Sequence, residues 1–172
     1  MSVRRLAIVM AMVLTALLLQ VSVLPVIAGG GFVPDLLVVL VVVLTLEHGV
    51  RTGLWVAAAS GLLVDLATSG VPLGASMLVM VAVAYLVGLM RPYLSERADL
   101  TTAVLAGILA VLSVLGHGAL AALLSTQEPP AAGVVAWSAL IVGVFAVLLA
   151  PPVLVLVRRS LDGPDSVLES SR

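Results

Sequence analysis

Six long apolar stretches, broken by short segments that carry charges, glycines or prolines, organise this chain. Each approaches the roughly 20 residues that an α-helix needs to cross the hydrocarbon core of a bilayer. The pattern therefore predicts an all-α membrane protein with six transmembrane helices. The predicted spans are Leu6–Leu24, Val33–Leu46, Val50–Thr68, Leu73–Met90, Leu100–Leu124 and Gly133–Val157.

The breaks between these stretches predict one domain. The second span is the shortest, and it either crosses with little tilt or extends into the glycine linker at 29–31. Only Glu47, His48 and Gly49 separate it from the third span, so the two are expected to form a tight antiparallel pair. Residues 1–160 are predicted to form a single six-helix domain. Residues 161–172 are expected to be a disordered cytoplasmic tail, because the chain turns polar there.

Composition excludes several classes of protein. With 62% hydrophobic residues and a mean hydropathy of +1.31, the chain is too apolar for a soluble domain of its size. It has no cysteine, which excludes disulfides and thiolate metal sites. No basic patch lies outside the membrane flanks, so binding to nucleic acid is not expected. The first apolar stretch exceeds the roughly 7–15 residues of a signal peptide, which favours a retained helix.

The arginines predict the orientation. All eight basic residues are arginines, and cytoplasmic loops of membrane proteins carry the excess of positive charge. With the amino terminus in the cytoplasm, six spans place every arginine on the cytoplasmic side, whereas five spans would place Arg158 and Arg159 outside. The sequence therefore predicts a multi-pass membrane protein with both termini cytoplasmic.

Asp65 is the candidate of greatest interest, because an ionised carboxylate within a membrane helix is costly and faces protein rather than lipid. It lies four residues before Ser69, where a turn with the sequence SGVPLG begins. Three alternatives are open. The carboxylate accepts hydrogen bonds from amides of this turn, pairs with a polar group on another helix, or binds a ligand or proton. His117 is expected at a similar depth, so a buried contact between Asp65 and His117 is one hypothesis; a histidine bonded to a carbonyl is the other.

A small-residue face runs along the third span. Gly49, Gly53, Ala57 and Gly61 are four residues apart, and Asp65 continues the series. Small side chains let membrane helices approach closely. The face is therefore a candidate either for packing within the chain or for an interface with a partner protein.

Enzymatic chemistry is not expected. The motifs G-x-S-x-G and H-E-x-x-H are absent, and no lysine follows a glycine loop. An intramembrane aspartyl enzyme would need two acids at the same depth, and Asp35 and Asp65 both fall near the outer face. However, no convergent polar groups accompany them in the sequence, and Asp35 is explained as a helix cap. The two histidines are predicted on opposite sides of the membrane, so a metal site is not expected. No cofactor and no catalytic residue are assigned.

One segment, residues 34–92, carries a more specific pattern. A proline opens the second span, a glycine-bearing inner turn follows, a glycine and an acid end the third span, a Pro-x-Gly turn comes next, and a tyrosine lies late in the fourth span. These positions are Pro34, Gly49, Gly53, Gly61, Asp65, Pro72, Gly74 and Tyr85. The pattern resembles the rod shape-determining protein MreD family, with Pro72 and Gly74 as its signature turn.

The resemblance implies a multi-pass protein of the bacterial cell (inner) membrane. Its implied function is that of a non-enzymatic scaffold of the cell-elongation complex, which organises peptidoglycan synthesis and cell shape. The implied partners are an MreC-like bitopic protein, a RodA-type glycosyltransferase with its class B penicillin-binding transpeptidase, the MreB cytoskeleton indirectly, and membrane lipid. The implied fold resembles the substrate-binding subunits of energy-coupling-factor transporters. A vitamin-binding subunit of such a transporter is therefore the alternative function. The scarcity of aromatic residues (3%) argues against it, since a vitamin pocket needs an aromatic lining.

Overall fold

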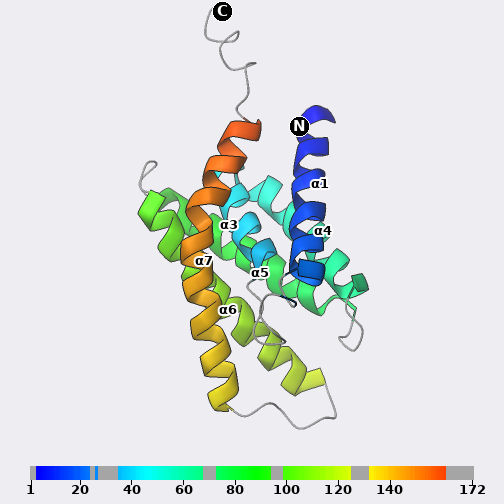
Figure 1. Cartoon of the computed structure of the whole chain (residues 1–172), viewed down its shortest axis with the longest axis vertical. Coiled ribbons are helices and arrows are strands. Elements are labelled where there is room, and N and C mark those ends of the chain that lie inside the picture. The colour runs from blue at the N-terminus through cyan, green and yellow to red at the C-terminus, as the bar shows by residue number, and fades with distance from the viewer. Residues whose placement is uncertain are drawn as a thin grey trace, which may run out of the picture.

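The computed structural model describes residues 3–23, 26, 35–67, 73–93, 99–124 and 132–161, and the described segments form a helical bundle (Figure 1). Five of the helices are long and apolar enough to cross a membrane, and a sixth is shorter. A helix lies at each of the six predicted spans, which confirms the all-α prediction. The elements are α1 (Val3–Leu18), continued by a π-helical turn (Leu19–Val23), α3 (Leu36–His48), α4 (Val50–Ala67), α5 (Ala75–Met90), continued by a 3-10 turn (Arg91–Tyr93), α6 (Asp99–Leu124) and α7 (Ala132–Leu161).

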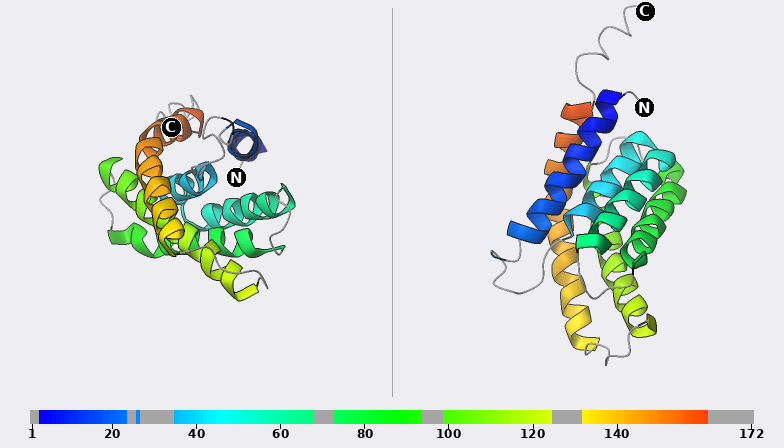
Figure 2. Two further views of the ribbon diagram at one scale, coloured as in Figure 1. Left: turned by 60° about the horizontal axis from the view of Figure 1, so that its bottom comes forward. Right: turned by 90° about the vertical axis from the view of Figure 1, so that its right-hand side faces the viewer.

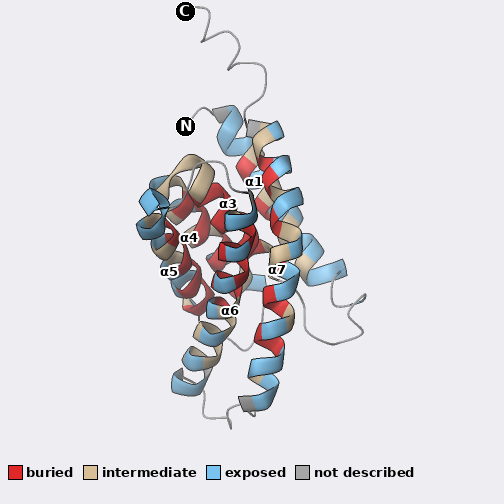
Figure 3. Cartoon of the chain, turned by 90° about the vertical axis from the view of Figure 1, so that its left-hand side faces the viewer, coloured by how far each residue is buried: buried red, intermediate tan, exposed pale blue. Residues whose placement is uncertain are grey.

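The short helix α3 is the centre of the bundle. Every residue from Leu37 to Thr45 is buried, and α1, α4, α5, α6 and α7 all pack against it (Figure 3). A helix that is apolar all round belongs in an interior. At about 1.5 Å per residue, its 13 residues give a length of about 20 Å. Its neighbours surround it, so it need not match the full thickness of the bilayer. The linker at 29–31 lies outside the described residues.

The other helices form a ring around α3, and α4 with α5 and α6 with α7 are the closest pairs. At the α6–α7 contact, a Cβ atom on Gly107 would lie 2.5 Å from Cγ2 of Val147 and 3.1 Å from the carbonyl oxygen of Gly143, so glycine allows these two helices to pack closely. Helix α1 packs more loosely at the edge of the bundle, beside α3 and α4 (Figure 2).

One end of the bundle gathers the start of α1 and the end of α7 (Figure 1). This arrangement agrees with an even number of crossings. The tail was predicted to begin at Leu161, but Leu161 is the last residue of α7. Residues 162–172 lie outside the described residues.

Candidate functional site

The carboxylate of Asp65 caps a helix other than its own. Its Oδ2 accepts hydrogen bonds from the backbone N–H of Gly74 (2.8 Å) and, at longer range, of Met77 (3.4 Å), and its Oδ1 accepts one from the N–H of Ser76 (3.0 Å). These amides begin α5, where N–H groups have no partner within the helix and the dipole favours an anion. Asp65 itself lies in the last turn of α4, the unfavourable end for an acid. The start of α5 thus provides donors for a carboxylate that is only 5% exposed.

The turn before α5 depends on glycine. Gly74 is the residue that precedes α5, and it adopts the left-handed conformation at φ +97° with no side chain to cap the helix. This conformation aims its N–H at Asp65, and residues with a Cβ adopt it only at a cost. The other residue of the predicted signature turn, Pro72, lies outside the described residues, as does Ser69.

The imidazole of His117, on α6, reaches Asp65 through Ser76. Its Nδ1 lies 2.9 Å from the carbonyl oxygen of Ser113, and its Nε2 lies 3.2 Å from the hydroxyl of Ser76. Because a carbonyl only accepts, Nδ1 carries a hydrogen, and in the neutral ring Nε2 accepts from the Ser76 hydroxyl. The two residues that the sequence suggested as a pair are therefore joined indirectly: Ser76 contacts the ring with its side chain and the carboxylate with its backbone.

A second polar contact ties the π-helical turn after α1 to the start of α3. Asp35 caps α3 by accepting a hydrogen bond from the N–H of Val38 (3.2 Å), as expected for an acid at this position. Gln20 donates to the same carboxylate (3.3 Å) and accepts from the N–H of Leu37 (3.3 Å). Gln20 was not predicted from the sequence. The available signal was the single carboxamide near the end of a predominantly apolar stretch, because a carboxamide must find a partner when it is withdrawn from water.

The small-residue face of α4 lies inside the bundle. A Cβ atom on Gly53 would collide with the side chain of Thr45 on α3, and one on Gly61 would lie 2.6 Å from the backbone nitrogen of Met77 on α5. Ala57, between them, is fully buried. This face therefore brings α4 against α3 and α5 of the same chain.

The opposite end of α3 is held by two arginines. Arg158 of α7 donates to the carboxylate of Glu47 at 2.9 Å and 3.1 Å, and Arg91 donates to the carbonyl oxygen of Leu46 at 3.0 Å. A Cβ on Gly49, which adopts φ +91°, would lie 3.4 Å from the Arg91 guanidinium. Both arginines therefore meet the turn between α3 and α4. This ion pair was also missed, because 111 residues separate its partners.

Both membrane-flanking aspartates act as helix caps. Asp35 and Asp65 each accept hydrogen bonds from the start of a helix, α3 and α5 respectively. Within the segments that the structure describes, no three His, Cys, Asp or Glu side chains converge as a metal site would require.

Comparison with known families identifies the chain. The sequence model of the rod shape-determining protein MreD family matches residues 2–160 of the 172 residues. This chain belongs to the MreD family. Membership implies a role in determining rod shape, and it agrees with the multi-pass membrane architecture described above. No curated protein and no solved structure matches the chain, so the similarity to the transporter subunits stays an expectation.

The positions that carried the resemblance to MreD can now be placed. Gly53, Gly61 and Asp65 form one face of α4, and Gly74 completes the contact with Asp65 at the start of α5. Tyr85, late in α5, is 55% exposed. Pro34 lies outside the described residues. The family pattern thus marks, at four of these positions, the close packing of α4 against α3 and α5.

Proposed function

We propose that this member of the MreD family is a non-enzymatic membrane scaffold of the bacterial cell-elongation complex. The observation that supports this most directly is the use of its buried polar groups. Asp35, Asp65 and His117 each bond to the chain itself, and buried groups that already have partners offer little to a substrate. What the chain presents outward is apolar helix surface.

The proposed partners are membrane proteins of peptidoglycan synthesis. An MreC-like bitopic protein and a RodA-type glycosyltransferase with its class B penicillin-binding transpeptidase associate through helix contacts within the bilayer, and MreB is linked indirectly. Because Gly53, Ala57 and Gly61 are occupied by packing within the chain, partner helices meet the exposed apolar sides instead. One such side runs along α6 through Val104, Ile108, Leu112 and Leu115.

The vitamin-binding alternative is less well supported. A ligand pocket needs several unoccupied polar groups that converge on an apolar cavity. The carboxylate of Asp65, the most notable polar group of the chain, instead accepts hydrogen bonds from the start of α5. Both tryptophans have most of their surface exposed, so they do not line an enclosed cavity.

The positions of the arginines support the proposed orientation in the membrane. Arg91 and Arg158 meet the turn between α3 and α4, and Arg51 is the second residue of α4. A basic cluster at one end of a membrane bundle belongs on the cytoplasmic side. Both termini are therefore proposed to be cytoplasmic, and a reporter fused after Arg159 should be active only inside the cell.

Purification from native membranes tests the scaffold proposal. A tagged chain, extracted in mild detergent, should co-purify with a bitopic MreC-like protein and with the synthase pair, as identified by mass spectrometry. Depletion of the chain should produce rounded cells, and re-expression should restore rods. Stoichiometric retention of a small vitamin, without these partners, would instead establish the transporter alternative.

A further inference from the structure

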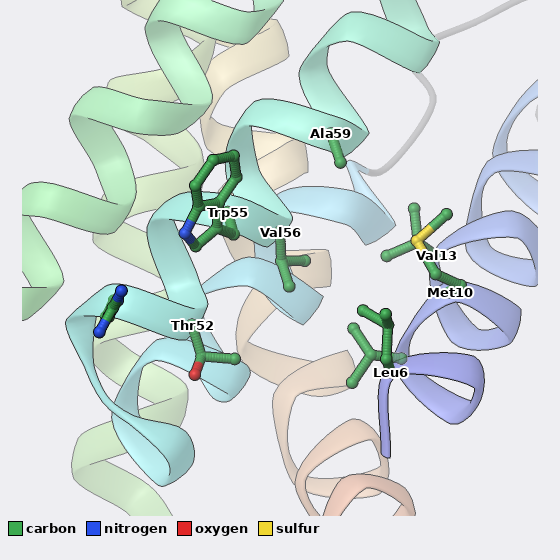
Figure 4. A pocket seen from close by; sticks show the side chains of 9 residues that line it. Leu6, Met10, Val13, Thr52, Trp55, Val56 and Ala59 are labelled. Atoms are coloured by element: carbon green, nitrogen blue, oxygen red, sulfur yellow. The ribbon is translucent and has the colours of Figure 1, made fainter. Parts of the chain in front are cut away.

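A groove between α1 and α4 has no role in the packing or in the proposed scaffold function. Its volume is about 550 Å³, and one wall includes Thr52, Trp55 and Ala59 of α4 (Figure 4). Leu6 and Met10 of α1 belong to the facing wall. The groove exists because α1 packs loosely against the edge of the bundle. It is partly open rather than an enclosed cavity.

The polarity of the groove changes along its length. Arg51 and Thr52 lie at the end next to the turn between α3 and α4, and the rest of the lining is apolar. From Arg51 to Ala59 the helix rises about 12 Å at 1.5 Å per residue. Trp55 lies one turn below Arg51 and is 73% exposed. A tryptophan at this depth is typical of the membrane interface.

We propose that this groove binds one acyl chain of an anionic phospholipid, with the phosphate at Arg51. A guanidinium forms paired hydrogen bonds with phosphate oxygens, and the Thr52 hydroxyl provides a further donor. Basic pockets between transmembrane helices on the cytoplasmic side are suited to anionic headgroups. The apolar remainder of the groove lies below that charge, as an acyl chain lies below its headgroup.

The distribution of polar groups favours a lipid over a partner helix. The two polar lining residues, Arg51 and Thr52, lie together at one end, and the remaining lining residues are apolar. A phospholipid has the same division between a charged headgroup and an apolar chain, whereas an apolar partner helix would leave the Arg51 guanidinium without a matching charge.

Lipid retention by the purified chain tests this proposal independently of the scaffold function, since no partner protein is needed. Native mass spectrometry in detergent would compare phosphatidylglycerol with phosphatidylcholine of identical acyl chains. The wild-type chain should retain phosphatidylglycerol more strongly. Arg51→Gln should weaken this binding about fivefold, which corresponds to the roughly 1 kcal/mol that one arginine contributes near anionic lipid. Arg51→Lys keeps the positive charge and should retain most of the phosphatidylglycerol binding.

Two matched controls separate the groove from general charge and bulk. Arg159→Gln removes an exposed arginine near the end of α7, outside the groove, and should leave binding unchanged. Ala59→Phe fills the groove and should weaken both lipids, whereas Ala82→Phe, on an exposed side of α5, should not. The proposal would be overturned if Arg159→Gln weakened phosphatidylglycerol binding as much as Arg51→Gln does. Equal binding of the two lipids by the wild-type chain, or no effect of Ala59→Phe, would also overturn it. So would a photo-crosslinker at position 59 that captures protein rather than lipid in membranes.

Discussion

Replacing Asp65 by alanine should destabilise the bundle strongly, because it removes the acceptor for the first amides of α5. Two of the three hydrogen bonds are short, 2.8 Å and 3.0 Å, and the carboxylate is buried. A buried donor left without a partner costs about 1–3 kcal/mol, so two donors set an upper value of about 6 kcal/mol. Deletion of an ordinary N-terminal cap costs about 0.5–2 kcal/mol and sets the lower value. We expect a loss of about 2–4 kcal/mol in the free energy of unfolding.

The measurement is reversible unfolding by SDS in mixed micelles, followed by circular dichroism. Asp65→Asn keeps one acceptor oxygen but loses the charge and turns an NH₂ group toward the amides, so it should lose about half as much. Thr15→Ala is the matched control: this threonine is exposed and bonds back to Ala11 of its own helix, and its loss should stay below about 0.5 kcal/mol. If Asp65→Ala were as mild as this control, the capping interpretation would be wrong. Loss of rod shape with a stable Asp65→Asn chain would instead indicate a ligand or proton site.

Three further predictions follow from the same contacts. Gly61→Ala forces a Cβ against the α5 backbone and should cost at least about 2 kcal/mol in SDS unfolding, whereas Gly118→Ala meets only an ordinary contact at 3.8 Å and should be nearly neutral; equal effects would refute the close approach. Gly74→Ala has free space for its Cβ, so its loss should be about 1–2 kcal/mol from the left-handed backbone alone, and a neutral result would argue against that conformation. Ser76→Ala and His117→Ala should be non-additive by about 0.5 kcal/mol or more in a double-mutant cycle, and strict additivity would exclude their hydrogen bond.

Much of the fold could be predicted from the sequence because bilayer thickness sets the length of apolar stretches. The second span shows the limit of this reasoning. Its shortness was visible, but its central position was not, since enclosure depends on how five other helices pack around it. The valine- and leucine-rich run from Leu37 to Leu44 has no polar side, and in a membrane protein that pattern does not separate lipid contact from protein contact.

The candidate site was predictable in part. A lone acid before a glycine- and proline-containing turn was enough to nominate Asp65, Gly74 and amide capping as one alternative. The serine between Asp65 and His117 could not be inferred, because Ser76 is one of many serines and threonines in apolar stretches. Contacts that depend on tertiary placement, such as Glu47 with Arg158, leave no local pattern.

The enclosure of α3 has a consequence for how the protein is made. The helix is about 20 Å long, about 10 Å less than the hydrocarbon core, and its two ends carry Asp35 and Glu47. Before the neighbouring helices are inserted, either these carboxylates would enter the hydrocarbon core or the bilayer would have to thin around α3. Helices α6 and α7 complete the enclosure of α3, but they are synthesised last because they come last in the chain. We therefore expect that α3 enters the membrane before the helices that enclose it, and that insertion factors or lipid stabilise its charged ends until α6 and α7 have been inserted.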